Sequence, residues 1–230
     1  MPAMILALAA LALQADPADL LARAARAADG ARSMRCEIRA EIARDGAAAA
    51  ATWTLIVRGD RARLTSETRR GDAVKTARVF VAGIRCTEFE DATRLEPEEV
   101  HRETARRLQS AIPRVGLGGL SWLAGAARYD KKARNDVPDA GALSITDAAI
   151  AGEEDVGRRR AWKVTYRAAP RNASAPPMSI TAWIDQERAL PLKLSSTVRE
   201  GERTFTIVEH VAVLDLNCEI ADDDFRVPEK

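Results

Sequence analysis

The chain has 230 residues, of which 47% are hydrophobic, 30% charged and 4% aromatic, a composition typical of a globular protein. The length suits one large β domain. Lys and Arg number 35 against 34 Asp and Glu, so the net charge is +1. This balance gives no global basic field for nucleic acid and no charge excess typical of disorder. With only His101 and His210 as imidazoles, a zinc or di-iron enzyme is not expected.

The first residues predict export. Residues 4–13 are apolar and carry no charge, which is too short a run for the about 20 residues that span a bilayer but suits the core of a signal peptide. Cleavage is expected after Ala12, with Ala15 as the alternative. The usual basic residues before the apolar run are missing, and a buried N-terminal helical turn is the other interpretation. We expect residues 1–15 to be a signal peptide and residues 16–230 to form a single soluble domain, periplasmic or otherwise exported.

Three cysteines, Cys36, Cys86 and Cys218, lie in strand-like segments. An exported compartment permits disulfides, but the odd number allows at most one bridge within the chain. Because the sequence has no C-x-x-C motif, thiol–disulfide chemistry is not favoured. Small buried side chains are the simpler interpretation of all three.

A short amphipathic helix and a set of strands are predicted for the first half. Asp16 suits the N-cap, Pro17 the first helical position, and Gly30 can end the helix. From Met34 the apolar residues recur with a period of two, as in a half-buried strand. Turn residues separate the strands predicted at 34–44, 52–58, 61–67, 74–81 and 84–89, which indicates an antiparallel meander.

The second half repeats this pattern after an insertion. Residues 97–113 are helical in pattern, and residues 115–127 are apolar and glycine-rich. Strands are predicted at 143–150, 161–167, 178–185, 191–199 and 204–216. Antiparallel strands with segregated helices define the α+β class. A sheet of about ten strands should curl or close.

The C-terminal third carries a resemblance to a known fold. Residues 180–194 (ITAWIDQERALPLKL) pair an aromatic and Ile-Asp with a polar turn and Leu-Pro, and residues 205–225 combine a long strand, Asn217, an acidic cluster and Phe225. This pattern resembles the LolA/LolB-like superfamily of outer-membrane lipoprotein carrier and sorting proteins. The resemblance implies a half-open, strongly curved antiparallel β-barrel of about ten strands, covered by helices on its concave side. It also implies a lipid acyl chain or lipoprotein as ligand, and a membrane-associated donor or acceptor protein as a further partner.

Candidate ligand-binding residues follow from the apolar faces of the last strands. Alternation predicts shared faces for Ile180, Ala182 and Ile184, for Leu190, Leu192 and Leu194, and for Phe205 and Ile207. An ordinary packed core would give the same pattern. A lid is expected from the glycine-rich segment, in which the apolar residues are Leu117, Leu120, Trp122 and Leu123. The alternative for this segment is a buried turn between helices.

No catalytic centre, metal site or cofactor is expected, because no histidine has a cysteine or carboxylate at metal-ligand spacing and no nucleophile has a partner base in sequence. The basic run Arg158–Arg160 could touch anionic lipid headgroups, although flanking acids offset its charge and a solvated hairpin is the simpler interpretation. We therefore expect a non-catalytic, carrier-like protein that does not bind nucleic acid. A periplasmic sensor or interaction module of the same fold, or a structural domain with a filled core, are the alternatives.

Overall fold

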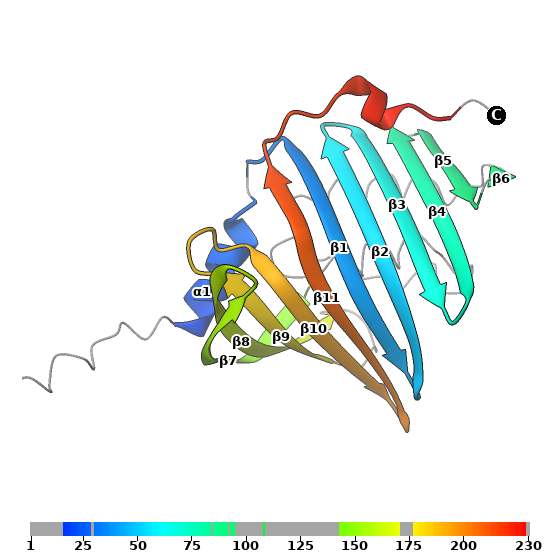
Figure 1. Cartoon of the computed structure of the whole chain (residues 1–230). Coiled ribbons are helices and arrows are strands. Elements are labelled where there is room, and N and C mark those ends of the chain that lie inside the picture. Colours follow the sequence, from blue (N-terminus) through cyan, green and yellow to red (C-terminus); the bar gives the residue numbers. More distant parts are fainter. Residues whose placement is uncertain are drawn as a thin grey trace, which may run out of the picture.

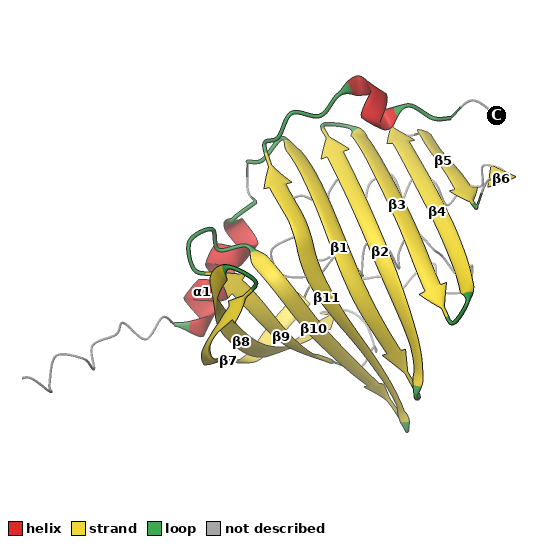
Figure 2. Cartoon of the chain, viewed as in Figure 1, coloured by secondary structure: helices red, strands yellow, loops and turns green. Residues whose placement is uncertain are grey.

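The alternating apolar pattern forms one antiparallel sheet (Figures 1 and 2). The computed structural model describes residues 16–28, 30–83, 85–91, 93–94, 108, 143–170 and 177–228. Within them the sheet has eleven strands. They are β1 (Ser33–Arg44), β2 (Ala47–Arg58), β3 (Arg61–Arg70), β4 (Ala73–Ala82), β5 (Arg85–Glu90), β6 (Thr93–Arg94), β7 (Leu143–Val156), β8 (Arg159–Pro170), β9 (Met178–Asp185), β10 (Pro191–Glu200) and β11 (Arg203–Leu216).

Two meanders meet along the pair formed by β1 and β11. The strand order is β6-β5-β4-β3-β2-β1-β11-β10-β9-β8-β7. Strands β1 to β6 therefore follow one another on one side of the seam, and β7 to β11 on the other. The strands of both halves were predicted, apart from the two-residue strand β6. The described strands are antiparallel, strongly curved and open at β6 and β7, as expected for a half-open barrel (Figure 1).

Helix α1 (Pro17–Arg26) lies on the inner side of the curved sheet (Figure 1). The Asp16 carboxylate accepts from the Ala18 N–H at 2.9 Å and Pro17 opens the helix, as predicted. Its apolar stripe buries Leu20, Leu21 and Ala24 against β8, β9 and β10. The helix is three residues shorter than the predicted length of about 13, because it ends at the C-cap Ala27, whose N–H donates to the Ala24 carbonyl, and Gly30 follows with a φ of 78°.

Of the helices predicted to cover the concave side, the part of the chain that the structure describes shows α1, the one α-helix there with defined ends. The helix expected at residues 97–113 lies outside the described residues except for Leu108. This residue is helical and fully buried in the apolar cluster of β1 to β4. The expected signal peptide, residues 1–15, also lies outside them.

The inner face of the sheet, defined as the face that α1 packs on, carries two apolar clusters. The first joins Met34, Ile38, Trp53, Leu55 and their neighbours in β1 to β4 to Leu214 of β11. The second joins α1 to the aliphatic residues of β8, β9 and β10. The buried members of the two clusters are at most 7% exposed, so this face holds the main hydrophobic core.

A C-terminal strap crosses the outer face. After β11, Asn217 takes a φ of 55° and its side chain accepts from the Arg32 N–H, which turns the chain toward the 3₁₀ helix η3 (Asp222–Phe225). Phe225 packs there with Ile56 and Ile220. Arg58 lies 5.4 Å from the centre of the Phe225 ring and also donates to Asp222. This hydrogen bond and the nearby charges of Arg58 and Arg61 lower the pKa of Asp222.

We expect Phe225→Ala to detach the strap. Removing a buried phenyl ring typically costs about 3 kcal/mol of the free energy of unfolding, and Arg58 also loses its aromatic contact. Urea unfolding followed by circular dichroism measures the loss. The matched control is Val227→Ala in the same segment, where the side chain is 36% exposed and a change within about 0.5 kcal/mol is expected. Equal losses for the two variants would contradict this account.

Candidate functional site

The sheet splits between β10 and β11. These strands pair from Glu200↔Arg203 to Lys193↔His210, whereas β11 continues alongside β1 as far as Leu216. β10 begins at Pro191, which has no N–H to donate to a neighbouring strand. Past His210, β11 therefore keeps one neighbour in the sheet and turns its other edge toward the opening.

A β-bulge lies on each side of this split. Glu37 and Ile38 of β1 pair with Val213 and Val211, so Ala212 is an extra residue in β11. Pro191 and Lys193 of β10 pair with Ile184 and Trp183, which makes Leu192 the extra residue there. Bulges redirect side chains and end strand pairing, and they are common beside functional sites.

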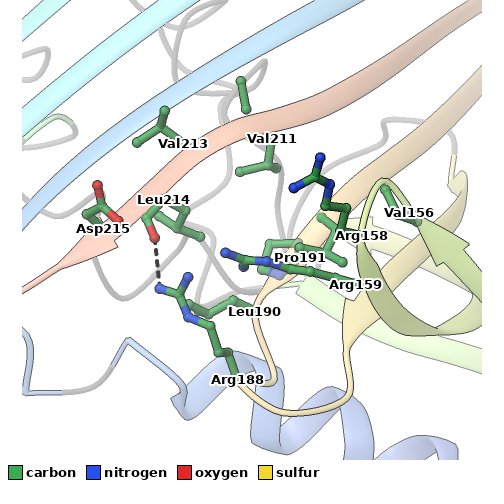
Figure 3. A pocket seen from close by; sticks show the side chains of 12 residues that line it. Val156, Arg158, Arg159, Arg188, Leu190, Pro191, Val211, Val213, Leu214 and Asp215 are labelled. Carbon is green, nitrogen blue, oxygen red and sulfur yellow. Dashed lines mark hydrogen bonds between the residues drawn. The ribbon is translucent and has the colours of Figure 1, made fainter.

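The split contains a pocket with a volume of about 360 Å³ (Figure 3). This volume lies at the lower end of the range of ligand pockets, about 300–1,000 Å³. Both bulge residues line it, together with segments from the β7–β8 turn, the β9–β10 turn and β11. The lining residues are Val156, Arg158, Arg159, Arg188, Leu190, Pro191, Leu192, Val211, Ala212, Val213, Leu214 and Asp215.

The β9–β10 turn is held by Asp185. This side chain is buried, and one of its carboxylate oxygens accepts from the backbone N–H groups of Glu187 and Arg188 at 2.8 and 3.1 Å. The other oxygen lies 3.3 Å from Nη1 of Arg159. Ala189 closes the turn in the left-handed region with a φ of 54°, a conformation that costs an alanine about 1 kcal/mol. Asp185 thus places Arg159 and Arg188 at the same pocket.

The three pocket arginines differ in what they bind. Arg188 donates from Nη2 to the Leu214 carbonyl at 2.8 Å, so it meets a backbone acceptor on the open edge of β11 (Figure 3). Arg159 is paired with Asp185, while Arg158 makes no ion pair with any described residue. Arg160, the next residue along, instead contacts Glu153 at 2.9 Å and Asp155 at 3.4 Å. The acids Glu153 and Asp155 therefore pair with Arg160 and do not offset the charges of Arg158 and Arg159, which line the pocket.

The aliphatic wall of the pocket connects two apolar clusters. Leu190 and Leu214 belong to the main inner-face cluster, and Val211 packs against it. Leu192 belongs to a small cluster with Ala161 and Trp183, against which Val156 packs. The pocket thus leads from three guanidinium groups to the hydrophobic inner face of the sheet.

The residues predicted from sequence to bind a ligand are spread over several places. Ile180, Ala182, Ile184 and Leu194 lie together in the inner-face cluster next to α1, and Ile207 packs against the other inner cluster. Leu192 leaves the face of Leu190 and Leu194, because the β10 bulge turns it into the pocket. Phe205 is 36% exposed at the far end of β11. Leu117, Leu120, Trp122 and Leu123 lie outside the described residues, and the lid stays a prediction.

The arginines of the pocket were only partly visible in the sequence. The run Arg158–Arg160 stands out, but Arg188 is a single basic residue in a turn, and nothing local marks it as a neighbour of Arg159. A useful signal is the position of Asp185 and Pro191 at the two ends of that turn, because a capping carboxylate and a proline together indicate a fixed loop.

Cys36, Cys86 and Glu209 are titratable groups of the inner face, whereas Cys218 packs against the cluster under the strap. Cys36, Cys86 and Cys218 are free thiols. Burial, with the charge of the neighbouring Glu209, raises the pKa of Cys36, and burial with Glu88 raises the pKa of Cys86 to about 12. Glu209 itself is buried between Ala40 and Leu194. In the described ranges, no three His, Cys, Asp or Glu side chains are arranged to hold a metal ion.

Comparison with known proteins gives likenesses of fold. No protein-family model matches the chain, and no curated protein sequence matches it significantly. The lipoprotein LppX of Mycobacterium tuberculosis is 16% identical with a TM-score of 0.47, covering 90% of this chain and 98% of LppX. MucB is 18% identical with a TM-score of 0.44, and a LolA superfamily protein from Nitrosomonas europaea is 11% identical with a TM-score of 0.34. The match covers 93% and 92% of this chain, and 63% and 97% of those proteins.

The chain thus spans less than two thirds of MucB. The matching structures also include a putative outer-membrane lipoprotein-sorting protein domain from Vibrio parahaemolyticus, which is 10% identical with a TM-score of 0.35. Within the described residues, no helix has both the length and the apolarity needed to cross a membrane.

We expect Asp185→Ala to loosen the β9–β10 turn. The change leaves two backbone N–H groups and Arg159 without their acceptor, at a cost of about 1–3 kcal/mol in the free energy of unfolding. Thermal and urea unfolding measure the loss. The control is Glu187→Ala in the same turn, whose exposed side chain should be replaced with little effect. A similar loss in both variants would show that Asp185 has no special role.

The thiols of Cys36 and Cys86 are expected to resist alkylation in the folded protein. A pKa of about 12 leaves roughly one Cys86 thiol in ten thousand as thiolate at pH 8, and Cys36 is 1% exposed with its pKa also raised. Iodoacetamide labelling at pH 8, followed by peptide mass spectrometry, should modify both only after unfolding in urea. Labelling of folded Cys86 at the rate of a free cysteine would contradict the burial effect.

Proposed function

We propose that this chain is an exported, non-catalytic binding protein that takes up the acyl chain of a lipid or lipoprotein. The observation that carries the proposal is the pocket at the split between β10 and β11, whose aliphatic wall is continuous with the inner-face cluster. A ligand that enters between the strands meets both the arginines and the aliphatic side chains, and Leu190, Val211 and Leu214 connect the pocket to the inner-face cluster.

Energetics support a hydrocarbon ligand. Each methylene group moved from water to an apolar contact contributes about 0.8 kcal/mol. Val211 of β11 faces the pocket from one side of the split, and Leu190 and Leu192, on either side of Pro191, face it from the other, so that hydrocarbon is contacted from two sides. A pocket of about 360 Å³ is small for a two-chain lipid, since ligand sites range up to about 1,000 Å³. A single acyl chain, or the end of one, is therefore the ligand that suits this volume.

The thiols support a binding role over a catalytic one. A nucleophilic cysteine needs a lowered pKa and access to substrate. Cys36 and Cys86 instead have raised pKa values because burial disfavours their charged forms. The pocket is lined by arginines, one aspartate and apolar residues. This set can hold a ligand in place but contains no nucleophile paired with a base.

Filling the pocket tests the proposal. We expect Val211→Trp to weaken binding of dodecanoic acid at least tenfold, because the indole would occupy the passage to the inner cluster. Native mass spectrometry and calorimetry with the purified chain measure the binding. The matched control is Val74→Trp on β4, where the valine is 45% exposed and lies outside the pocket, and it should bind as tightly as the parent chain.

Val213→Trp provides a second test if Val211→Trp fails to fold, because Val213 lines the same pocket but lies outside the main inner cluster. Failure of the parent chain to bind dodecanoic acid or another single-chain amphiphile would overturn the proposed function. Equal binding by the parent chain and by folded pocket variants would place the ligand elsewhere.

A further inference from the structure

We propose that Arg158, Arg159 and Arg188 form a binding site for an oxyanion, a phosphate or carboxylate, carried as the headgroup of the acyl ligand. This inference rests on the proposed function and adds a chemical class to the ligand. Three separate segments bring the guanidinium groups to one pocket. Arg158 comes from the β7–β8 turn, Arg159 from the start of β8, and Arg188 from the β9–β10 turn (Figure 3).

The local charges leave this site positive. Among the lining residues there are three arginines and one carboxylate, Asp215. Asp185, behind the pocket, offsets the charge of Arg159. Taking the three arginines together with Asp185 and Asp215 leaves one positive charge. In Figure 3, Asp215 lies beyond Leu214 as seen from Arg158 and Arg159, so its carboxylate does not lie between these two guanidinium groups.

The donors that face the pocket are available to a ligand. A guanidinium group has five N–H donors in a plane, a geometry that matches two oxygens of a phosphate or carboxylate. Arg188 donates from Nη2 to the Leu214 carbonyl, and the N–H groups on its other two nitrogens can donate to a ligand. This hydrogen bond also fixes the direction of the side chain, which reduces the entropy lost when an anion binds. Arg158 makes no ion pair with the described residues, so none of the described carboxylates competes with an anion for its donors.

The apolar wall distinguishes a headgroup from a free anion. Leu190, Leu192 and Val211 lie in the same pocket as the arginines. An inorganic anion would contact the guanidinium groups alone and gain nothing from contact with these side chains. An amphiphile satisfies both halves of the pocket, with the oxyanion at the arginines and the first methylene groups on the aliphatic wall.

The test compares an amphiphile with two probes, each of which carries one half of it. Dodecyl phosphate carries both anion and chain, dodecanol carries the chain alone, and inorganic phosphate carries the anion alone. We expect the parent chain to bind dodecyl phosphate at least tenfold more tightly than either of the others, as measured by calorimetry. Raising the salt concentration should weaken binding of dodecyl phosphate and leave binding of dodecanol nearly unchanged, because only the ionic contact is screened.

Variants locate the anion. Arg158→Gln with Arg188→Gln should weaken dodecyl phosphate at least tenfold and leave dodecanol unchanged. Arg158→Gln alone should weaken binding of dodecyl phosphate severalfold. This single variant serves if loss of the Arg188 contact with Leu214 prevents the double variant from folding, because it breaks no ion pair between described residues. The matched control is Arg160→Gln, one residue from Arg159, because Arg160 pairs with Glu153 and Asp155 and does not line the pocket. It should bind like the parent chain.

The outcomes separate this inference from the proposed function. Equal binding of dodecyl phosphate and dodecanol, unaffected by the arginine variants, would overturn the oxyanion site and leave acyl binding in place. Inorganic phosphate bound as tightly as dodecyl phosphate, and lost in the variants, would establish an oxyanion site for a free anion and overturn the headgroup. Failure of all three probes would overturn both proposals.

Discussion

The pairing of β1 with β11 is the constraint on which the rest of the structure depends. It joins two meanders, each built from short local turns, into one sheet through residues more than 150 positions apart, as in Arg35↔Asp215. Adjacent strands rotate by about 20° relative to one another, so a sheet of eleven strands cannot remain flat. The curvature gives the sheet an inner face, and the apolar residues of both meanders and of α1 meet on that face.

The same seam creates the pocket. β11 follows β1 to Leu216 but loses β10 beyond His210, so its last residues are held from one side. Buried backbone groups must find partners, and the hydrogen bond from Arg188 to the Leu214 carbonyl supplies one. The bulges at Ala212 and Leu192 redirect the chain on the two sides of the opening. The cavity therefore forms where β11 extends past the end of its pairing with β10, and it is lined by arginines and aliphatic side chains.

Sequence patterns predicted most of the strands but did not reveal which residues line the pocket, and the reason is physical. A period of two reports which residues share a face, and glycines report turns, so β1, β9 and most other strands were located within a few residues. Bulges break that period. Alternation places Leu192 on the face of Leu190 and Leu194, but Leu192 is the extra residue of the bulge and packs with Ala161 and Trp183. The meeting of Arg159 with Arg188 depends on Asp185 and on strand order, which local patterns do not contain.

The distribution of charge shows why an overall balance near zero says little about a binding site. Glu153, Glu154 and Asp155 lie beside the basic run in sequence, and their three negative charges equal its three positive charges. In the fold, Glu153 and Asp155 bind Arg160, while Glu154 binds Lys163 and the indole N–H of Trp183. Successive residues of β8 point to opposite faces of the sheet, so Arg159 reaches Asp185 while Arg160 reaches the acids of β7. The alternation of one strand thus divides a neutral stretch of sequence between an acidic surface around Arg160 and a positive pocket.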